Sequence, residues 1–93
     1  MATVIARVKW TDYDEVLRIF AEHADVRKSF GCQGTTIFRN AEDPNEVMIL
    51  FEWDELESMD RFFADPDVQS IALPTMANTP INFVVSESHD FSS

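Results

Sequence analysis

The chain has 93 residues, of which 45% are apolar and 12% aromatic, so it suits one globular domain and is too apolar to be disordered. Its formal net charge of −10 leaves no basic stripe for nucleic acid or for an anionic membrane. Because Cys32 is the only cysteine, no disulfide forms within the chain, which fits a reducing cytoplasm. We therefore expect one soluble, cytoplasmic domain over residues 1–93, with no signal peptide, no membrane span and no nucleic-acid partner.

The first half of the chain contains a strand pattern, a helix pattern and a second strand pattern. Residues 3–10 alternate apolar and polar side chains with a period of two, which predicts a strand. Thr11 stands at the N-cap position of a helix predicted over 12–28, because acidic residues fill its first turn and apolar residues follow at helical spacing. Gly31 ends this helix or begins the next loop, and a second strand is predicted over 35–40.

The second half contains a hairpin, an interrupted helix and a last strand. An Asp-Pro-Asn sequence marks the hairpin turn, and Asp54 is predicted as a helix N-cap. The predicted elements are a turn at 41–45, a strand at 46–53, a helix at 55–64, a short helix from Pro66 that Pro74 ends, and a strand at 81–88. The order β-α-β-β-α-β predicts an α+β, ferredoxin-like fold, with one four-stranded antiparallel sheet and both helices on one face.

The predicted sheet is apolar on both faces. In the third strand Phe51 and Trp53 point to one face and Met48 and Leu50 to the other, and we expect Phe83 on the same face as Trp53. No further element is left to cover the second face, and leaving large apolar side chains open forfeits about 1.5–3 kcal/mol each relative to burial. A second copy of the chain is the economical cover. We therefore predict a homodimer through the sheet face; the alternative is a monomer with a modest apolar patch.

Two basic side chains, Arg7 and Lys9, fall on the second face of the first strand. Buried charges need partners of opposite sign. We expect these two to pair with Glu46 or Glu52 of the third strand, or with the partner subunit.

Four segments give the chain a family resemblance. They are Gly31-Cys32-Gln33-Gly34, the acidic turn with Pro44, the strand end Phe51-Glu52-Trp53, and Phe63-Ala64-Asp65-Pro66. Together with the order of elements over nearly the whole chain, they resemble the dimeric α+β barrel superfamily and, within it, the antibiotic-biosynthesis-monooxygenase-like domain. The resemblance implies a pocket between sheet and helices in each subunit. For the enzymes of the family it implies oxidation of anthrones or quinols by dioxygen without a cofactor.

Other activities found on this fold match the sequence less well. Haem-degrading relatives use an Asn on the first strand, a Trp on the third strand and a His on the second helix. Trp53 matches the Trp, but the first strand has no Asn and residues 54–73 contain no His. Cyclase relatives use strand histidines, and none of the predicted strands carries one. We therefore expect neither haem degradation nor cyclisation, and no cofactor.

His23 is the principal candidate for chemistry. It lies at the border of the apolar stripe of the first predicted helix, where a neutral imidazole facing a pocket acts as a general base. The alternative is a partly exposed histidine at the rim. Tyr13 and Arg39 are the other groups expected near the pocket that supply a base or a cation. Tyr13 also suits packing, and Arg39 also suits an ion pair with Glu42 or Asp43.

An aromatic wall is the second expected feature of the pocket. Trp10 and Trp53 fall on the face assigned to the helices, and aromatic side chains there suit a planar apolar ligand. The alternative is that these rings simply fill a thin core. We predict His23 and Trp53 as catalytic residues. The predicted substrate-binding residues are Trp10, Tyr13, Phe20, Phe51, Phe62 and Phe83.

No metal site is predicted, because no His or Cys pair has zinc-ligand spacing and the pair Asp65 and Asp67 lacks the calcium-loop pattern. Cys32 is not expected to act as a nucleophile, since no His is nearby in the sequence. The leading hypothesis is a small dimeric α+β barrel protein that works as a cofactor-independent monooxygenase on an aromatic or polyketide-like substrate. The alternative is a non-catalytic dimer that binds a small apolar ligand or has a structural role.

Overall fold

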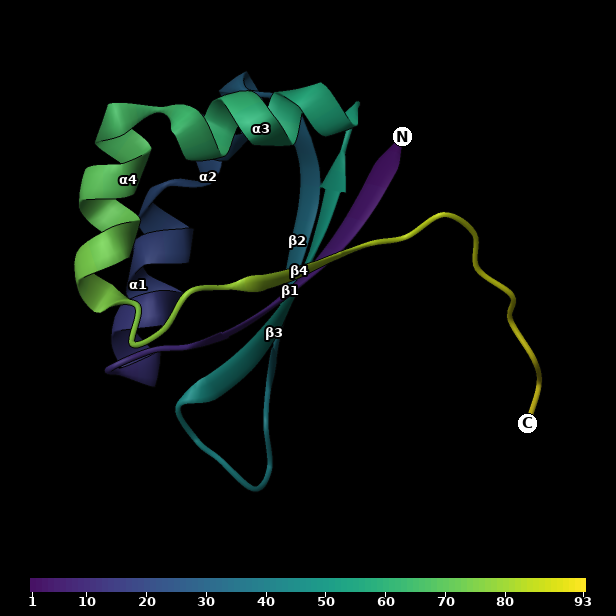
Figure 1. The fold of residues 1–93 in the computed structure, drawn as a ribbon, viewed down its shortest axis with the longest axis horizontal. Coiled ribbons are helices and arrows are strands. Elements are labelled where there is room, and N and C mark those ends of the chain that lie inside the picture. The colour runs from purple at the N-terminus through teal and green to yellow at the C-terminus, as the bar shows by residue number, and fades with distance from the viewer.

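The molecule consists of one sheet and one layer of helices, as Figure 1 shows. The computed structural model describes residues 1–93. The strands are β1 (Ala2–Lys9), β2 (Cys32–Arg39), β3 (Glu46–Trp53) and β4 (Ile81–Val84). They lie in the order β2-β3-β1-β4, and every neighbouring pair is antiparallel. The helices are α1 (Tyr13–Glu22), α2 (Ala24–Ser29), α3 (Leu56–Ala64) and α4 (Pro66–Ala72), followed by the 3₁₀ turn η1 (Leu73–Thr75). This arrangement confirms the predicted α+β, ferredoxin-like fold.

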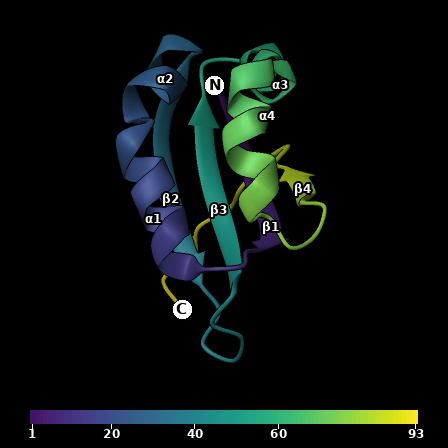
Figure 2. The same cartoon turned by 90° about the vertical axis from the view of Figure 1, so that its left-hand side faces the viewer.

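All helices lie on one side of the sheet (Figure 1). Seen from that side, α1 and α2 form one column and α3 and α4 form another, with β3 visible between them (Figure 2). We call the helix side of the sheet the covered face and the other side the open face. The residues after β4 extend away from the helices (Figure 1). Each helix is too short and too polar to serve as a membrane span.

The first predicted helix is in fact two helices. Asp12 rather than Thr11 is the N-cap of α1, and its side chain accepts the backbone N–H of Asp14 at 3.0 Å. His23 then interrupts the helix, with φ −111° and ψ 20°. Its backbone N–H donates to the carbonyl oxygen of Ile19 at 3.1 Å, and its ring Nδ1 lies 2.8 Å from the same oxygen. The interruption fixes the position of the His23 ring at the junction of α1 and α2.

The covered face carries the core of the protein. Side chains of β1 and β3 alternate between buried and more exposed positions, as the period of two predicts. The buried positions of these two strands are Val4, Ala6, Val8, Val47, Ile49, Phe51 and Trp53. The helices meet them with Val16, Ile19, Met59, Phe62 and Val68. The prediction that Phe51 and Trp53 of the third strand face the helices is therefore confirmed.

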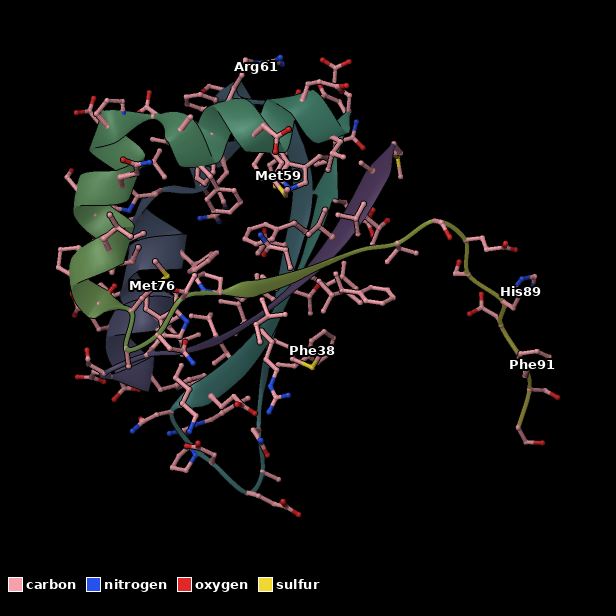
Figure 3. All side chains as sticks on the ribbon, viewed as in Figure 1. Phe38, Met59, Arg61, Met76, His89 and Phe91 are labelled. Atoms are coloured by element: carbon pink, nitrogen blue, oxygen red, sulfur yellow. The ribbon has the colours of Figure 1, made fainter.

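The open face carries large apolar side chains that nothing in the chain covers. Phe38 is 54% exposed and Met48 is 45% exposed, and Phe38 lies on this side of the sheet in Figure 3. Phe83 pairs with Ile5 of β1, and residues paired across strands share a face, so the prediction that Phe83 lies on the covered face is wrong. The sequence of β4 is apolar on both faces, and only its register with β1 decides which face each residue takes. The strand also ends at Val84 rather than at residue 88.

The charged residues of the open face are paired within the chain. Arg7 Nη2 lies 3.1 Å from a carboxylate oxygen of Glu46, as expected. Lys9 Nζ lies 3.1 Å from Asp43 in the turn, rather than beside a residue of the third strand. Hydrogen bonds from Asn40 and Arg7 hold the pKa of Glu46 below its ordinary value. Neither cation needs a carboxylate from a partner subunit.

Gly31 forms the tight connection from α2 into β2. Its φ of +107° lies in the region that favours glycine. A Cβ at this position would lie 2.5 Å from Oδ1 of Asp54. The backbone N–H of Asp54 donates to the Gly31 carbonyl oxygen at 2.9 Å, which ties the start of β2 to the end of β3. Glu55, one residue after the predicted Asp54, is the N-cap of α3.

Candidate functional site

A cavity of about 530 Å³ lies between the covered face and the helices. Strands β1 and β3 form its floor, α1 and α2 form one wall, and α3 and α4 form the other, while the segment 76–82 also contributes. Met59 and Met76 both line it and lie on the helix side of the sheet (Figure 3). Hydrophobic residues make up 17 of the 24 that line the cavity, so its ligand must be largely apolar.

Part of the predicted site lines this cavity and part does not. The residues that line it are Trp10, Phe20, His23, Phe51 and Phe62. Trp53, Tyr13 and Phe83 lie elsewhere. The cavity is thus lined by His23, the predicted base, and by four of the predicted aromatic residues.

The aromatic side chains of the wall are in contact with one another. The Trp10 and Phe20 rings meet edge to face, with centroids 6.5 Å apart. The ring centroid of Phe51 lies 6.2 Å from that of Phe20 and 5.9 Å from that of Phe63. The ring centroids of Phe62 and Phe63 lie 5.2 Å apart. These ring separations are those of favourable aromatic pairs, so the wall presents a connected aromatic surface to a planar ligand.

His23 has one ring nitrogen occupied and one available. Because a carbonyl oxygen only accepts hydrogen bonds, the 2.8 Å contact with Ile19 requires a hydrogen on Nδ1. In the neutral ring Nε2 then carries the lone pair. The side chain is partly buried and belongs to the cavity lining. The helix interruption therefore fixes the tautomer in which Nε2 accepts a proton.

Two hydrogen-bond donors of the lining have no acceptor in the protein. The indole Nε1 of Trp10 is buried without a partner. The Arg27 guanidinium lies with its Cζ 4.8 Å from the centroid of the Phe20 ring and forms no ion pair. Arg27 is not among the residues predicted from the sequence. Its spacing in the sequence could have identified it. Arg27 follows Phe20 by seven residues and His23 by four, so a helix would place the three on one face.

Trp53 belongs to the core behind the cavity wall. Its side chain is 0% exposed, and its ring centroid lies 5.8 Å from that of Phe51 and 5.4 Å from that of Phe62. Both of these rings line the cavity, whereas Trp53 does not. Trp53 was predicted to be catalytic, but in this structure it supports the wall and does not touch the space inside it.

The sequence places this site in a known family. The profile of antibiotic biosynthesis monooxygenases matches residues 1–72, which include β1, β3 and all four helices around the cavity. The chain belongs to the antibiotic biosynthesis monooxygenase family. No curated protein matches the chain significantly.

Solved structures of this family share the fold. A crystal structure of an antibiotic biosynthesis monooxygenase is 17% identical, with 96% of this chain and 100% of the other covered and a TM-score of 0.72. SnoaB, a cofactor-independent oxygenase from Streptomyces nogalater, is 16% identical, with 99% of this chain and 97% of SnoaB covered and a TM-score of 0.75. At these identities the likeness is one of fold.

In this family member, Tyr13 and Arg39 contact each other outside the cavity. Arg39 Cζ lies 4.1 Å above the centroid of the Tyr13 ring, and its Nε donates to the Pro44 carbonyl oxygen at 2.8 Å. The expected ion pair of Arg39 with Glu42 or Asp43 does not form. Stacking on Tyr13 and the hydrogen bond to a carbonyl oxygen hold the guanidinium at the protein surface. Neither residue brings a base or a cation into the cavity.

Cys32 also lies outside the main cavity. Its thiol is buried, and Sγ lies 3.5 Å from the Gly34 carbonyl oxygen and 3.5 Å from the Thr35 hydroxyl. No group of three or more His, Cys, Asp or Glu side chains comes close enough together to hold a metal ion. The cavity on the covered face is therefore the candidate site of this molecule.

Proposed function

We propose that this family member is a cofactor-independent monooxygenase that acts on a planar aromatic or polyketide-like substrate in the cavity of the covered face. The observation that carries the proposal is His23, which lines an aromatic cavity with Nε2 as the nitrogen left to accept a proton. Membership of the family and the fold shared with SnoaB support the class of reaction.

The reaction requires a substrate that gives an electron to dioxygen, and deprotonation turns an anthrone or quinol into such a donor. His23 Nε2 removes the proton as a general base. The aromatic wall orients the ring system, and the apolar lining excludes water from the anion. When an anthrone becomes an anthraquinone, one atom of dioxygen becomes the new carbonyl oxygen. The other atom leaves as water with the two hydrogens of the former methylene group.

We also propose that two copies join through their open faces. Phe38, Met48, Ile81 and Phe83 are all exposed there, and burying each contributes about 1.5–3 kcal/mol. A twofold dimer matches one apolar face with an identical one, so no other partner is needed. The proposed location is the cytoplasm, because the single cysteine has no disulfide partner in the chain.

Binding without turnover is the second candidate function. The position of Trp53 favours it, since the second predicted catalytic residue is 0% exposed and does not reach the cavity. In that case the same aromatic wall holds a small apolar ligand, and His23 only accepts a hydrogen bond from it through Nε2.

Oxygen uptake distinguishes the two candidates. An oxygen electrode measures consumption with anthrones and quinols for wild type, His23→Ala and Trp53→Phe. We expect uptake by wild type and a loss of about 100-fold or more in His23→Ala, the usual contribution of a general base. Trp53→Phe is expected to lose less, because it alters only the support of Phe51 and Phe62.

His89→Ala is the matched control, since His89 lies on the C-terminal tail (Figure 3) and bonds to Glu87 there. Its rate should equal that of wild type. If no anthrone or quinol drives uptake, the oxygenase proposal fails and ligand binding remains. Equal rates in wild type and His23→Ala would exclude His23 as the base.

A further inference from the structure

Arg27 is a partly buried cation of this acidic chain that has no counter-ion. The chain has 7 Lys and Arg residues against 17 Asp and Glu residues. Arg7, Lys9, Arg18 and Arg61 each form an ion pair with a carboxylate. Lys28 is exposed and forms none, and Arg39 donates to the Pro44 carbonyl oxygen instead. Arg27 is partly buried and forms no ion pair, and no side chain or carbonyl accepts a hydrogen bond from its guanidinium. A guanidinium stays ionised and has five N–H donors. Arg27 lines the main cavity and also a smaller pocket beside Cys32.

Arg27 and His23 line the same cavity. Arg27 lines the cavity from α2 and stacks on Phe20, which also contacts Trp10. Stacking uses the face of the guanidinium and leaves the N–H donors at its edge. Burial lowers the pKa of Arg27, and the nearby Cys32 has a smaller opposite effect.

The other charged or titratable groups of the lining do not neutralise Arg27. They are His23, which is bonded through Nδ1 to Ile19, and Asp60 of α3. Asp60 is exposed and forms no ion pair with Arg27. The cavity thus combines an apolar aromatic wall, one cation without a counter-ion and one proton acceptor.

We propose that Arg27 binds the deprotonated oxygen of the substrate, so that the cavity takes a planar aromatic ring system with an acidic hydroxyl group and holds it as an oxyanion. This inference rests on the proposed function. The O–H bond breaks, the proton moves to His23 Nε2, and the electron pair stays on the oxygen beside Arg27. Arg27 thereby makes the substrate a stronger acid and selects hydroxylated aromatic compounds over plain hydrocarbons.

The test uses two probes that differ in charge. 2-Hydroxy-1,4-naphthoquinone is a planar acid that is ionised at neutral pH, and 2-methoxy-1,4-naphthoquinone is its neutral ether. Isothermal titration calorimetry at neutral pH gives the affinity of both probes for wild type, Arg27→Met and Arg27→Lys. Lys28→Met is the matched control, because it removes the same charge from the next residue, which does not line this cavity. Circular dichroism and thermal unfolding establish that each variant folds.

We expect wild type to bind the anionic probe about 10–100-fold more tightly than Arg27→Met, since an opposite charge a few ångströms away favours the ionised form of an acid by this order. The affinities of the two proteins for the neutral ether should agree within about twofold, because Met keeps an apolar stem of similar length. Arg27→Lys should retain part of the preference for the anion, and Lys28→Met should behave as wild type.

Three results would overturn the inference. They are equal affinity of wild type and Arg27→Met for the anion, an equal loss in Arg27→Met and Lys28→Met, and failure of wild type to bind either probe. Oxygen uptake separates this inference from the proposed function. Arg27-dependent binding without any uptake refutes the oxygenase and leaves the oxyanion site. Uptake with the same kcat/KM in wild type and Arg27→Met refutes the oxyanion site and leaves the oxygenase.

Discussion

The two faces of the sheet are built from the same strands and have different environments. On the covered face Val4 and Trp53 are 0% exposed, whereas on the open face Phe83 is 65% exposed. Both faces are apolar, so apolar character alone does not distinguish a binding cavity from an assembly surface. The polar groups distinguish the two surfaces. Arg7 and Lys9 on the open face are paired, whereas Arg27 beside the covered face has no counter-ion. A site for chemistry is marked by donors and acceptors that the chain itself leaves unpaired.

The largest expected effect comes from opening the covered face. Trp53→Ala removes a fully buried ring and should lower the free energy of unfolding by about 3–5 kcal/mol. Leu17→Ala on α1, where the side chain is partly exposed, should cost less than about 1 kcal/mol. Urea denaturation at a fixed protein concentration measures both. A loss below about 1 kcal/mol for Trp53→Ala would show that the ring is not packed as described.

A charge on the open face should weaken the dimer and leave ligand binding in the cavity unchanged. Phe83→Asp places a carboxylate on each copy, and losing two buried rings should weaken dimerisation at least about 100-fold. Sedimentation velocity measures the change, with Leu17→Asp on α1 as the control that stays dimeric. Binding of 2-methoxy-1,4-naphthoquinone should be unchanged, because Phe83 does not line the cavity. A wild-type protein that is monomeric at micromolar concentration would refute the dimer.

Backbone strain distinguishes the two glycines near the start of β2. Gly31→Ala forces a Cβ into the left-handed region and against Asp54, so we expect a loss of about 1–3 kcal/mol in stability. Gly34→Ala is the matched control, because nothing lies within 4 Å of its added Cβ. Thermal or urea unfolding compares the two variants. Equal stabilities would mean that the connection from α2 to β2 is not held by Gly31.

The smallest expected effect concerns the charges at the open face. The pKa of Glu46 is lowered from about 4.5, so its carboxylate contributes stability above the unfolded-state pKa. That contribution is lost as the pH falls through the lowered folded-state pKa. Glu46→Gln should therefore weaken the acid dependence of unfolding, whereas Glu87→Gln on the tail should not. Urea midpoints measured between neutral and acidic pH show the difference, and identical pH profiles of wild type and Glu46→Gln would contradict it.

The order of elements was predictable because periodicity and turn residues act locally. The third strand shows this, since Phe51 and Trp53 lie on the predicted face. The fourth strand shows the limit, because its residues are apolar on both faces and the register with β1 alone sets the position of Phe83. Local patterns also predicted one helix over 12–28, whereas the structure has two helices that meet at His23, whose ring bonds to the Ile19 carbonyl oxygen.

The site was only partly predictable for a similar reason. His23 and the aromatic residues Trp10 and Phe20 follow from their positions on an apolar face. The depth of Trp53 depends on rings contributed by α3, and no local pattern reveals that depth. Arg27 lies in the last turn of the helix predicted over 12–28, where a cation is common, and no sequence pattern reveals that it lacks an ion pair.

We propose that the covered face binds the substrate and that the open face joins two copies. A crystal structure with 2-hydroxy-1,4-naphthoquinone tests both parts at once. We expect the ligand in the cavity between β3 and the helices, with its hydroxyl oxygen within hydrogen-bond distance of Arg27 and near His23 Nε2. We expect Phe83 to be buried at a twofold contact between sheets. A ligand bound on the open face, or a cavity closed by side chains while Phe83 faces solvent, would contradict it.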